Sequence, residues 1–134
     1  MSDRTNELGQ PIGFAVPDWS LCSRPPREPM QGRYVRLEPI NAASHAQDLF
    51  EAFAADRENR IWTYLPYGPF ASVDDCRIWI ENTCLGDDPL FHAIIDGDTG
   101  RAVGVASYLR IEPAVGVIEV GHINYAPALQ KTRG

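Results

Sequence analysis

The residues most able to do chemistry lie near the end of the chain. Glu119 places a carboxylate within the otherwise apolar run 117–123. Gly121 follows two residues later, and a glycine inside a strand often marks a bulge or a close backbone approach. If this run is a strand, both positions face the same way. The carboxylate is then either a solvated edge group or one kept for a purpose.

A second candidate follows at once. Pro127 ends the apolar run, and residues 131–134 read Lys-Thr-Arg-Gly, which is basic, polar and flexible. A loop of this kind before a helix can offer backbone N–H groups to a phosphate, assisted by the helix dipole. The alternative is an ordinary polar chain end.

Two segments with helical apolar spacing must help to position these groups. The first runs through residues 46–54, and Asn41 or Ser44 could cap it. The second could begin at Ser72, with Asp75 as its capping partner, and end near Gly86. The side chains expected to face the core are Ala46, Leu49, Phe50, Phe53, Ala54, Val73, Cys76, Ile80 and Cys84.

Strand patterns surround these helices. Residues 33–38 alternate polar and apolar side chains before Pro39, and from Pro89 onward a period of two indicates strands at 90–95, 101–111 and 117–125. The intervening turns, 96–100 and 112–116, are short, which favours antiparallel neighbours. The expected order is β-α-α-β-β-β. This is an α+β fold with a mixed, mainly antiparallel sheet.

Residues 1–30 differ from the rest of the chain. They contain Pro11, Pro17, Pro25, Pro26 and Pro29, which argue against helix, and yet they alternate large apolar side chains from residue 12 to residue 16. We expect an extended arm that lies across the body of the protein or across a partner subunit. A homo-oligomer is therefore one expectation.

Composition narrows the function classes. A chain of 134 residues suits one domain, and its net charge of −6 argues against a nucleic-acid partner. No run of about 18 apolar residues exists, so no membrane span is expected. The polar N-terminus lacks a signal-like apolar segment, and three cysteines without metal-ligand spacing suggest reduced thiols. We therefore expect a cytoplasmic protein without a metal.

The element order and three motifs resemble a known family. Residues 118–122, Ile-Glu-Val-Gly-His, are similar to the fourth-strand pattern of the GCN5-related N-acetyltransferase (GNAT) family. Residues 125–127, Tyr-Ala-Pro, are similar to the Val-x-Pro that closes that strand, and Gln130 stands where the pyrophosphate signature begins. The resemblance covers residues 32–134, is nearest to the ribosomal-protein N-terminal acetyltransferases, and corresponds to the N-terminal half of such a domain.

The resemblance is incomplete at the pyrophosphate signature. Arg133 stands where the first glycine of the signature is expected, Gly134 takes the variable position, and the last small residue would be number 135. We therefore expect residues 31–134 to be a partial N-acetyltransferase domain, a fragment inactive alone. The alternative is a non-catalytic half-fold that serves as an assembly or ligand-binding module.

The resemblance implies an acetyl transfer from acetyl-CoA to a small-molecule or peptide amine. Glu119 would be the base, acting through a water, and a strand N–H near Ile123 would stabilise the oxyanion. The general acid of the family, a tyrosine, has no matching position in this sequence. The residues implied to bind acetyl-CoA are Ile123, Asn124 and Tyr125 on the strand and Gln130, Lys131, Thr132, Arg133 and Gly134 in the loop.

Aromatic residues and histidines complete the candidates. Trp62, Tyr64 and Tyr67 lie between the expected helices, in the loop that lines the acceptor site of the resembling family; the alternative is a local aromatic cluster. His122 is either a base or substrate contact, or a partly buried structural histidine. His45 is expected on the exposed side of its helix, without a catalytic role.

Overall fold

The computed structural model describes residues 4–134 and confirms the expected fold class. One sheet contains five strands in the order β1-β2-β3-β4-β5, and every neighbouring pair is antiparallel. Its helices are α1 (Ala42–Ala54) and α2 (Val73–Trp79), the latter continued by a π-helical turn, Ile80–Cys84. The strands are β1 (Met30–Gln31), β2 (Val35–Pro39), β3 (Leu90–Asp96), β4 (Ala102–Glu112) and β5 (Val117–Tyr125).

Both helices begin at the capping residues that the sequence offered. The Asn41 side chain accepts the backbone N–H of Ser44, which identifies Asn41 as the cap of α1. The Ser72 hydroxyl accepts the N–H of Asp75 at the start of α2. Each cap satisfies a backbone donor that has no partner within its helix, and is worth about 1 kcal/mol.

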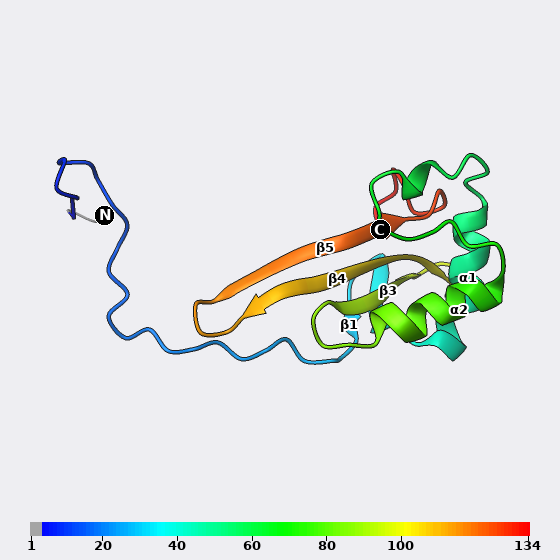
Figure 1. Cartoon of the computed structure of the whole chain (residues 1–134), viewed down its shortest axis with the longest axis horizontal. Coiled ribbons are helices and arrows are strands. Elements are labelled where there is room, and N and C mark those ends of the chain that lie inside the picture. Colours follow the sequence, from blue (N-terminus) through cyan, green and yellow to red (C-terminus); the bar gives the residue numbers. More distant parts are fainter. Residues whose placement is uncertain (1–3) are drawn as a thin grey trace.

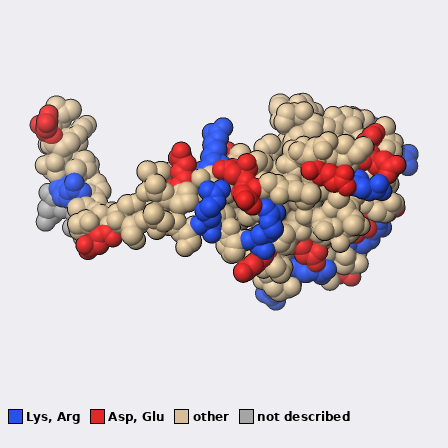
Figure 2. Space-filling view, turned by 60° about the horizontal axis from the view of Figure 1, so that its bottom comes forward, with Lys and Arg blue, Asp and Glu red and all other residues tan. Residues whose placement is uncertain are grey.

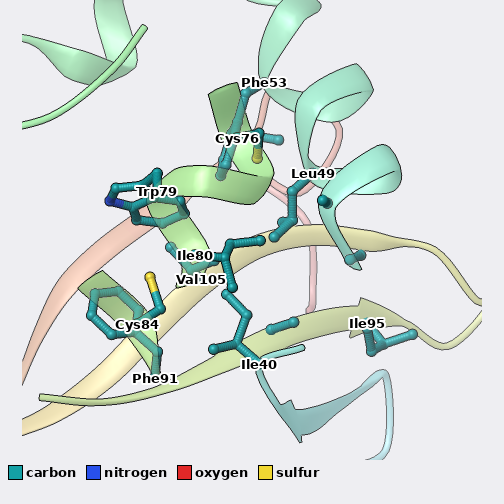
Figure 3. Close-up of a cluster of buried hydrophobic side chains, with 14 of the residues drawn as sticks. Ile40, Leu49, Phe53, Cys76, Trp79, Ile80, Cys84, Phe91, Ile95 and Val105 are labelled. Carbon is teal, nitrogen blue, oxygen red and sulfur yellow. The ribbon is translucent and has the colours of Figure 1, made fainter. Parts of the chain in front are cut away.

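The helices cover one face of the sheet and build the main core there (Figure 3). Leu49 from α1 and Cys76 and Ile80 from the second helix are fully buried against Phe91 and Val105 of the sheet. Burying a large apolar side chain contributes about 1.5–3 kcal/mol. Burial also raises the pKa of the Cys76 thiol to about 12, so this cysteine is an unreactive core residue.

A smaller cluster lies on the opposite face of the sheet. Ile94 and Val103 pack there with Leu129, which follows β5. The chain then runs toward β2, where a Cβ at Gly134 would lie 2.7 Å from a methyl carbon of Val35. The end of the chain therefore returns across this face.

Strand β5 is the open edge of the sheet, because it pairs with β4 alone within residues 4–134. The β4–β5 hairpin extends well past the helices (Figure 1). Several of its large apolar side chains are exposed: Val117, Ile118, Val120, Ile123 and Tyr125.

The N-terminal arm rests on the tip of this hairpin and then leads away from the body (Figure 1). The Trp19 indole N–H donates to the Ala114 carbonyl at 2.9 Å, and the Cys22 N–H donates to the Pro113 carbonyl at the same distance. Figure 2 shows charges of both signs where the arm meets the body, and a mostly uncharged outer arm.

The expectation for His45 was wrong. This side chain is buried, because its Nδ1 accepts the Asn41 N–H at 2.9 Å and its Nε2 bonds to the Glu38 carboxylate at 2.8 Å. Helical spacing alone could not reveal that a histidine in the first turn folds back to the preceding strand. Hydrogen bonds from Arg36 and His45 lower the pKa of Glu38.

No helix in the described range is long and apolar enough to cross a bilayer.

Candidate functional site

The centre of the candidate site is a bulge in β5. Asn124 pairs with Val105 and Gly121 pairs with Ser107, so two residues of β5, His122 and Ile123, lie opposite one residue of β4. His122 has a positive φ of 49°, a conformation uncommon for a residue other than glycine. The bulge that Gly121 indicated therefore lies directly after it, and it turns the His122 side chain out of the regular alternation.

Hydrogen bonding stabilises the bulge from the β4 side. The Ser107 hydroxyl, which is buried, donates to the Gly121 carbonyl at 2.9 Å. A bulge disrupts the regular ladder, and a hydroxyl from the neighbouring strand satisfies the carbonyl instead. Sequence reasoning did not single out Ser107, and only the register of the two strands could have identified it.

Glu119 lies on the helix-covered side of β5 but beyond the helices. It pairs with Leu109 of β4. The Leu109 side chain points to the same face of the sheet as the side chain of Val105, four residues earlier on the strand. Its carboxylate is 46% exposed and lies 3.3 Å from the Arg110 guanidinium. A Cβ at Gly121 would lie 2.8 Å from a methyl carbon of Leu109 and 3.8 Å from Glu119 Oε1, so the glycine lets Leu109 pack against the strand beside the carboxylate.

The loop between the helices reaches the bulge through Tyr67. Its hydroxyl lies 3.0 Å from His122 Nδ1, and the two rings stack at 5.8 Å with an angle of 19°. Phe91 contacts the histidine ring as well, at 5.3 Å. Burial, with a smaller contribution from Cys84, raises the pKa of Tyr67, so its phenol stays protonated. These two residues are 55 positions apart, and no sequence signal pairs them.

The three aromatic candidates of this loop therefore have different surroundings. Trp62 is a buried core residue, edge-on to Phe53 at 5.0 Å and to Phe70 at 5.1 Å. Tyr64 points to solvent and is 96% exposed. Of the three, the structure brings only Tyr67 to β5.

Two buried nitrogen donors near this pair have no hydrogen-bond partner within residues 4–134: Asn124 Nδ2 and Trp79 Nε1. Asn124 is only 4% exposed and, as the register partner of Val105, faces the helices. The Trp79 ring contacts Tyr67 at 4.9 Å. Sequence reasoning placed Asn124 in the site but missed Trp79, whose spacing on α2 resembles that of any core residue.

The loop after β5 is held in place by its own hydrogen bonds. The Leu129 and Gln130 N–H groups donate to the Ala126 carbonyl, and the Gln130 side chain donates to the Tyr125 carbonyl at 2.8 Å. Gln130 therefore closes the loop with its side chain. Lys131 follows with a positive φ of 58°.

Backbone donors become available after this turn. The N–H groups of Lys131, Thr132 and Arg133 make no hydrogen bond to any described residue. Thr132 uses its hydroxyl internally, since it donates to the Leu129 carbonyl at 2.6 Å and accepts the Gly134 N–H at 3.3 Å. Free N–H groups beside basic side chains suit an anionic ligand.

A hollow of about 620 Å³ adjoins this loop, lined by Thr132 and Arg133 and by the region of β2. Arg133 extends over the ring of Tyr34, with its guanidinium carbon 5.9 Å from the ring centre. Asp96 and Asp98 also line the hollow, so its surface carries negative as well as positive side chains.

Together these features suit an elongated ligand with an anionic part. The open edge of β5 offers backbone groups on the side away from β4, and the same strand leads into the loop with free donors. The groups that suit proton transfer and recognition, Glu119 and the Tyr67–His122 pair, lie on the helix-covered side of the strand.

Comparisons with known proteins bear on this arrangement. No family model matches the chain, and no curated protein matches it. Among solved structures, a GCN5-related N-acetyltransferase from Brucella melitensis matches 85% of the chain with 38% identity and a TM-score of 0.81. A probable acetyltransferase of the GNAT family from Chromobacterium violaceum matches 92% of the chain with 33% identity and a TM-score of 0.78.

The matched part of these proteins is limited. The chain spans 52% of the Brucella structure and 61% of the Chromobacterium structure. Within that span, two helices against an antiparallel sheet reproduce their architecture. The chain therefore has the fold of the GCN5-related N-acetyltransferases.

Proposed function

We propose that this chain binds acetyl-CoA along the outer edge of β5 and belongs to an enzyme that transfers the acetyl group to an amine. The observation that carries the proposal is the continuity of the site. A bulged, open-edged strand leads directly into a loop whose N–H groups at Lys131, Thr132 and Arg133 are free.

In this proposal the pantetheine amides pair with the backbone of Ile123, Asn124 and Tyr125, as an added strand would. The pyrophosphate meets the N–H groups of residues 131–134, of which those of Lys131, Thr132 and Arg133 are free. Arg133 can leave Tyr34 and pair with a phosphate oxygen through its guanidinium. This side chain would then compensate for the glycine that the family pattern expects at this position.

The chemistry requires a neutral amine. The ammonium proton passes to Glu119 through a water; the amine nitrogen then bonds to the thioester carbon, and the carbon–sulfur bond breaks. An N–H of the bulge, near Ile123, stabilises the oxyanion that forms between these steps. The bonded nitrogen then loses a second proton, and the departing thiolate takes up a proton to give the free thiol of CoA. The half-exposed position of Glu119 gives a bridging water access to its carboxylate.

The acceptor is a small-molecule or peptide amine that reaches β5 beside Tyr67. We place the chain nearest to the ribosomal-protein N-terminal acetyltransferases, on the motif in residues 118–122, and in the cytoplasm. Because the chain spans about half of its solved relatives, we propose that residues 1–134 alone transfer acetyl groups slowly or not at all.

A thermal melt with acetyl-CoA tests the binding proposal. At about 100 times the dissociation constant, a ligand contributes about 2.7 kcal/mol and should raise the melting temperature by several degrees. An unchanged melting temperature at millimolar acetyl-CoA would refute the proposal. A rise without acetyl transfer to any amine, in this chain and in any longer form, would instead support a non-catalytic binding module.

A further inference from the structure

The hydrogen bond between Tyr67 and His122 determines where the imidazole carries its proton. His122 Nδ1 is the one acceptor that the described residues offer to the Tyr67 hydroxyl. If the imidazole donated instead, the phenol hydrogen would have no partner in a half-buried place, which is unfavourable. Tyr67 therefore donates to Nδ1, and in neutral His122 the proton lies on Nε2.

His122 consequently presents an N–H group that is held in one direction. The ring is fixed between Tyr67 and Phe91, and its side chain is only partly buried. His122 Nε2 makes no hydrogen bond to any residue in the range 4–134. The positive φ of His122 adds strain, and strained residues of this kind concentrate at functional sites.

Two further donors without acceptors lie beside this pair. Asn124 follows the bulge on the same face, and its Nδ2 is buried without a partner. Trp79 contacts the Tyr67 ring, and Figure 3 shows its indole nitrogen pointing away from the other labelled core side chains. Leaving a buried donor unpaired is unfavourable, because the donor has lost its hydrogen bond to water. Asn124 Nδ2 and Trp79 Nε1 are therefore donors that no described residue satisfies.

We infer that His122, positioned by Tyr67, and Asn124 bind a carbonyl or carboxylate oxygen carried by the acceptor close to its amino group. The inference rests on the proposed function and specifies its acceptor. An alkylamine or polyamine would leave these donors unpaired. Amines with a neighbouring oxygen should therefore bind at least about tenfold more tightly, since tenfold corresponds to about 1.4 kcal/mol.

Nuclear magnetic resonance of the ¹⁵N-labelled chain saturated with CoA tests this subsite without requiring turnover. Glycinamide supplies a carbonyl oxygen, glycine supplies a carboxylate, and propylamine supplies neither. We expect the first two to shift the His122 ring and Asn124 side-chain signals, and to bind at least tenfold more tightly than propylamine. Preference for glycinamide would identify a carbonyl ligand, and preference for glycine would identify a carboxylate. Equal affinities for all three probes would overturn the inference.

A matched pair of variants separates positioning from structure. Tyr67→Phe keeps the stacked ring but removes the hydroxyl, so we expect a mixture of His122 tautomers and loss of the oxygen preference. Tyr64→Phe removes the hydroxyl of an exposed tyrosine in the same loop, and it should change neither the His122 tautomer nor the preference for oxygen-bearing amines. His122→Asn, which tolerates the positive φ and still offers an amide donor, should restore part of the preference relative to His122→Ala.

An unchanged tautomer and an unchanged preference in Tyr67→Phe would contradict the assigned role. Binding of CoA, followed separately by calorimetry, distinguishes the two proposals. If CoA binds and the probes leave His122 undisturbed, the subsite is wrong and the proposed function stands. If the oxygen-bearing probes bind at His122 and CoA does not bind, the subsite stands and the proposed function fails.

Discussion

The helix-covered part of the sheet and strand β5 belong to one sheet, but they differ in how fully their side chains are buried and their backbone groups are paired. Under the helices, Leu49, Ile80 and Phe91 are fully buried. On β5 the outer edge is open, the register breaks at His122, and large apolar side chains face solvent. The first region stabilises the fold, whereas the second leaves backbone and side-chain groups without partners among the described residues, and we propose that a ligand binds there.

A single sheet can contain both a stabilising region and a region with unpaired groups, because the bulge at His122 and Ile123 interrupts the regular pairing of β4 with β5. Before the bulge, Glu119 lies beyond the helices and is half exposed. After it, Asn124 faces the helices and is buried. Mutations should therefore affect mainly stability in the covered region and mainly binding on β5.

The largest effect is expected in the covered core. Leu49→Ala should lower the free energy of unfolding by about 2–5 kcal/mol, because it leaves a cavity between α1 and the sheet. Val120→Ala, on the exposed side of β5, should change it by no more than about 0.5 kcal/mol. Urea denaturation measures both, and similar losses would erase the contrast between the regions.

The next effect concerns the junction of the two regions. A Cβ at Gly104 would lie 2.8 Å from the Asn124 carbonyl oxygen, so Gly104→Ala should push β5 away and cost about 1–3 kcal/mol. At Gly86 nothing lies within 4 Å of such a Cβ, which makes Gly86→Ala a suitable control. A Gly104→Ala protein as stable as the control would show that β5 is not held tightly to β4.

Binding should respond to the loop after β5. Arg133→Ala should weaken acetyl-CoA binding by about three- to tenfold, through loss of a charge-assisted hydrogen bond at an exposed position. Calorimetry should show this loss with an unchanged melting temperature of the free protein. Arg77→Ala, on α2, is the control and should leave the affinity unchanged. Equal affinities of the two variants for acetyl-CoA would show that Arg133 does not take part in binding.

A gain of stability is expected where the site leaves a donor unpaired. Asn124→Leu has a similar volume and removes the unpartnered amide, so it should be neutral or stabilising by about 1 kcal/mol. The same change should abolish the preference for oxygen-bearing amines. Marked destabilisation in urea denaturation would mean that Asn124 stabilises the fold.

The smallest effect is a pH dependence from His92. Burial lowers the pKa of this histidine, which bonds to the Glu28 carbonyl at 3.3 Å. The unfolded chain therefore binds more protons below about pH 6.5, and stability should fall as the pH drops from 7.5 to 5.5. The slope cannot exceed about 1.4 kcal/mol per pH unit from this group. His92→Gln should flatten it, and an unchanged slope would exclude His92 as the cause.

Periodicity and capping residues were sufficient to predict the covered region. The spacing of Leu49, Cys76 and Ile80 identified buried stripes, and Ser72 identified a helix start. These are local signals, in which each residue reports its own element. His45 and Ala54 were the exceptions. Ala54 was expected to face the core but is exposed. The partners of His45 on β2 and in the preceding turn override helical spacing.

The site could be predicted only in part. The residue types at Glu119, Gly121 and Pro127 indicated the strand and its loop. The pairing of Tyr67 with His122 and the hydroxyl of Ser107 on the bulge depend on strand register and loop path. Those are set by contacts between distant residues, which a single sequence does not reveal.

The central claim is that acetyl-CoA lies along β5 and ends at the following loop. A titration of acetyl-CoA into the ¹⁵N-labelled chain, followed by backbone amide shifts, tests it most directly. We predict that the amides of residues 123–125 and 131–134 shift together with one dissociation constant, while those within α1 stay in place. Shifts confined to other elements, or none at saturating ligand, would contradict the claim.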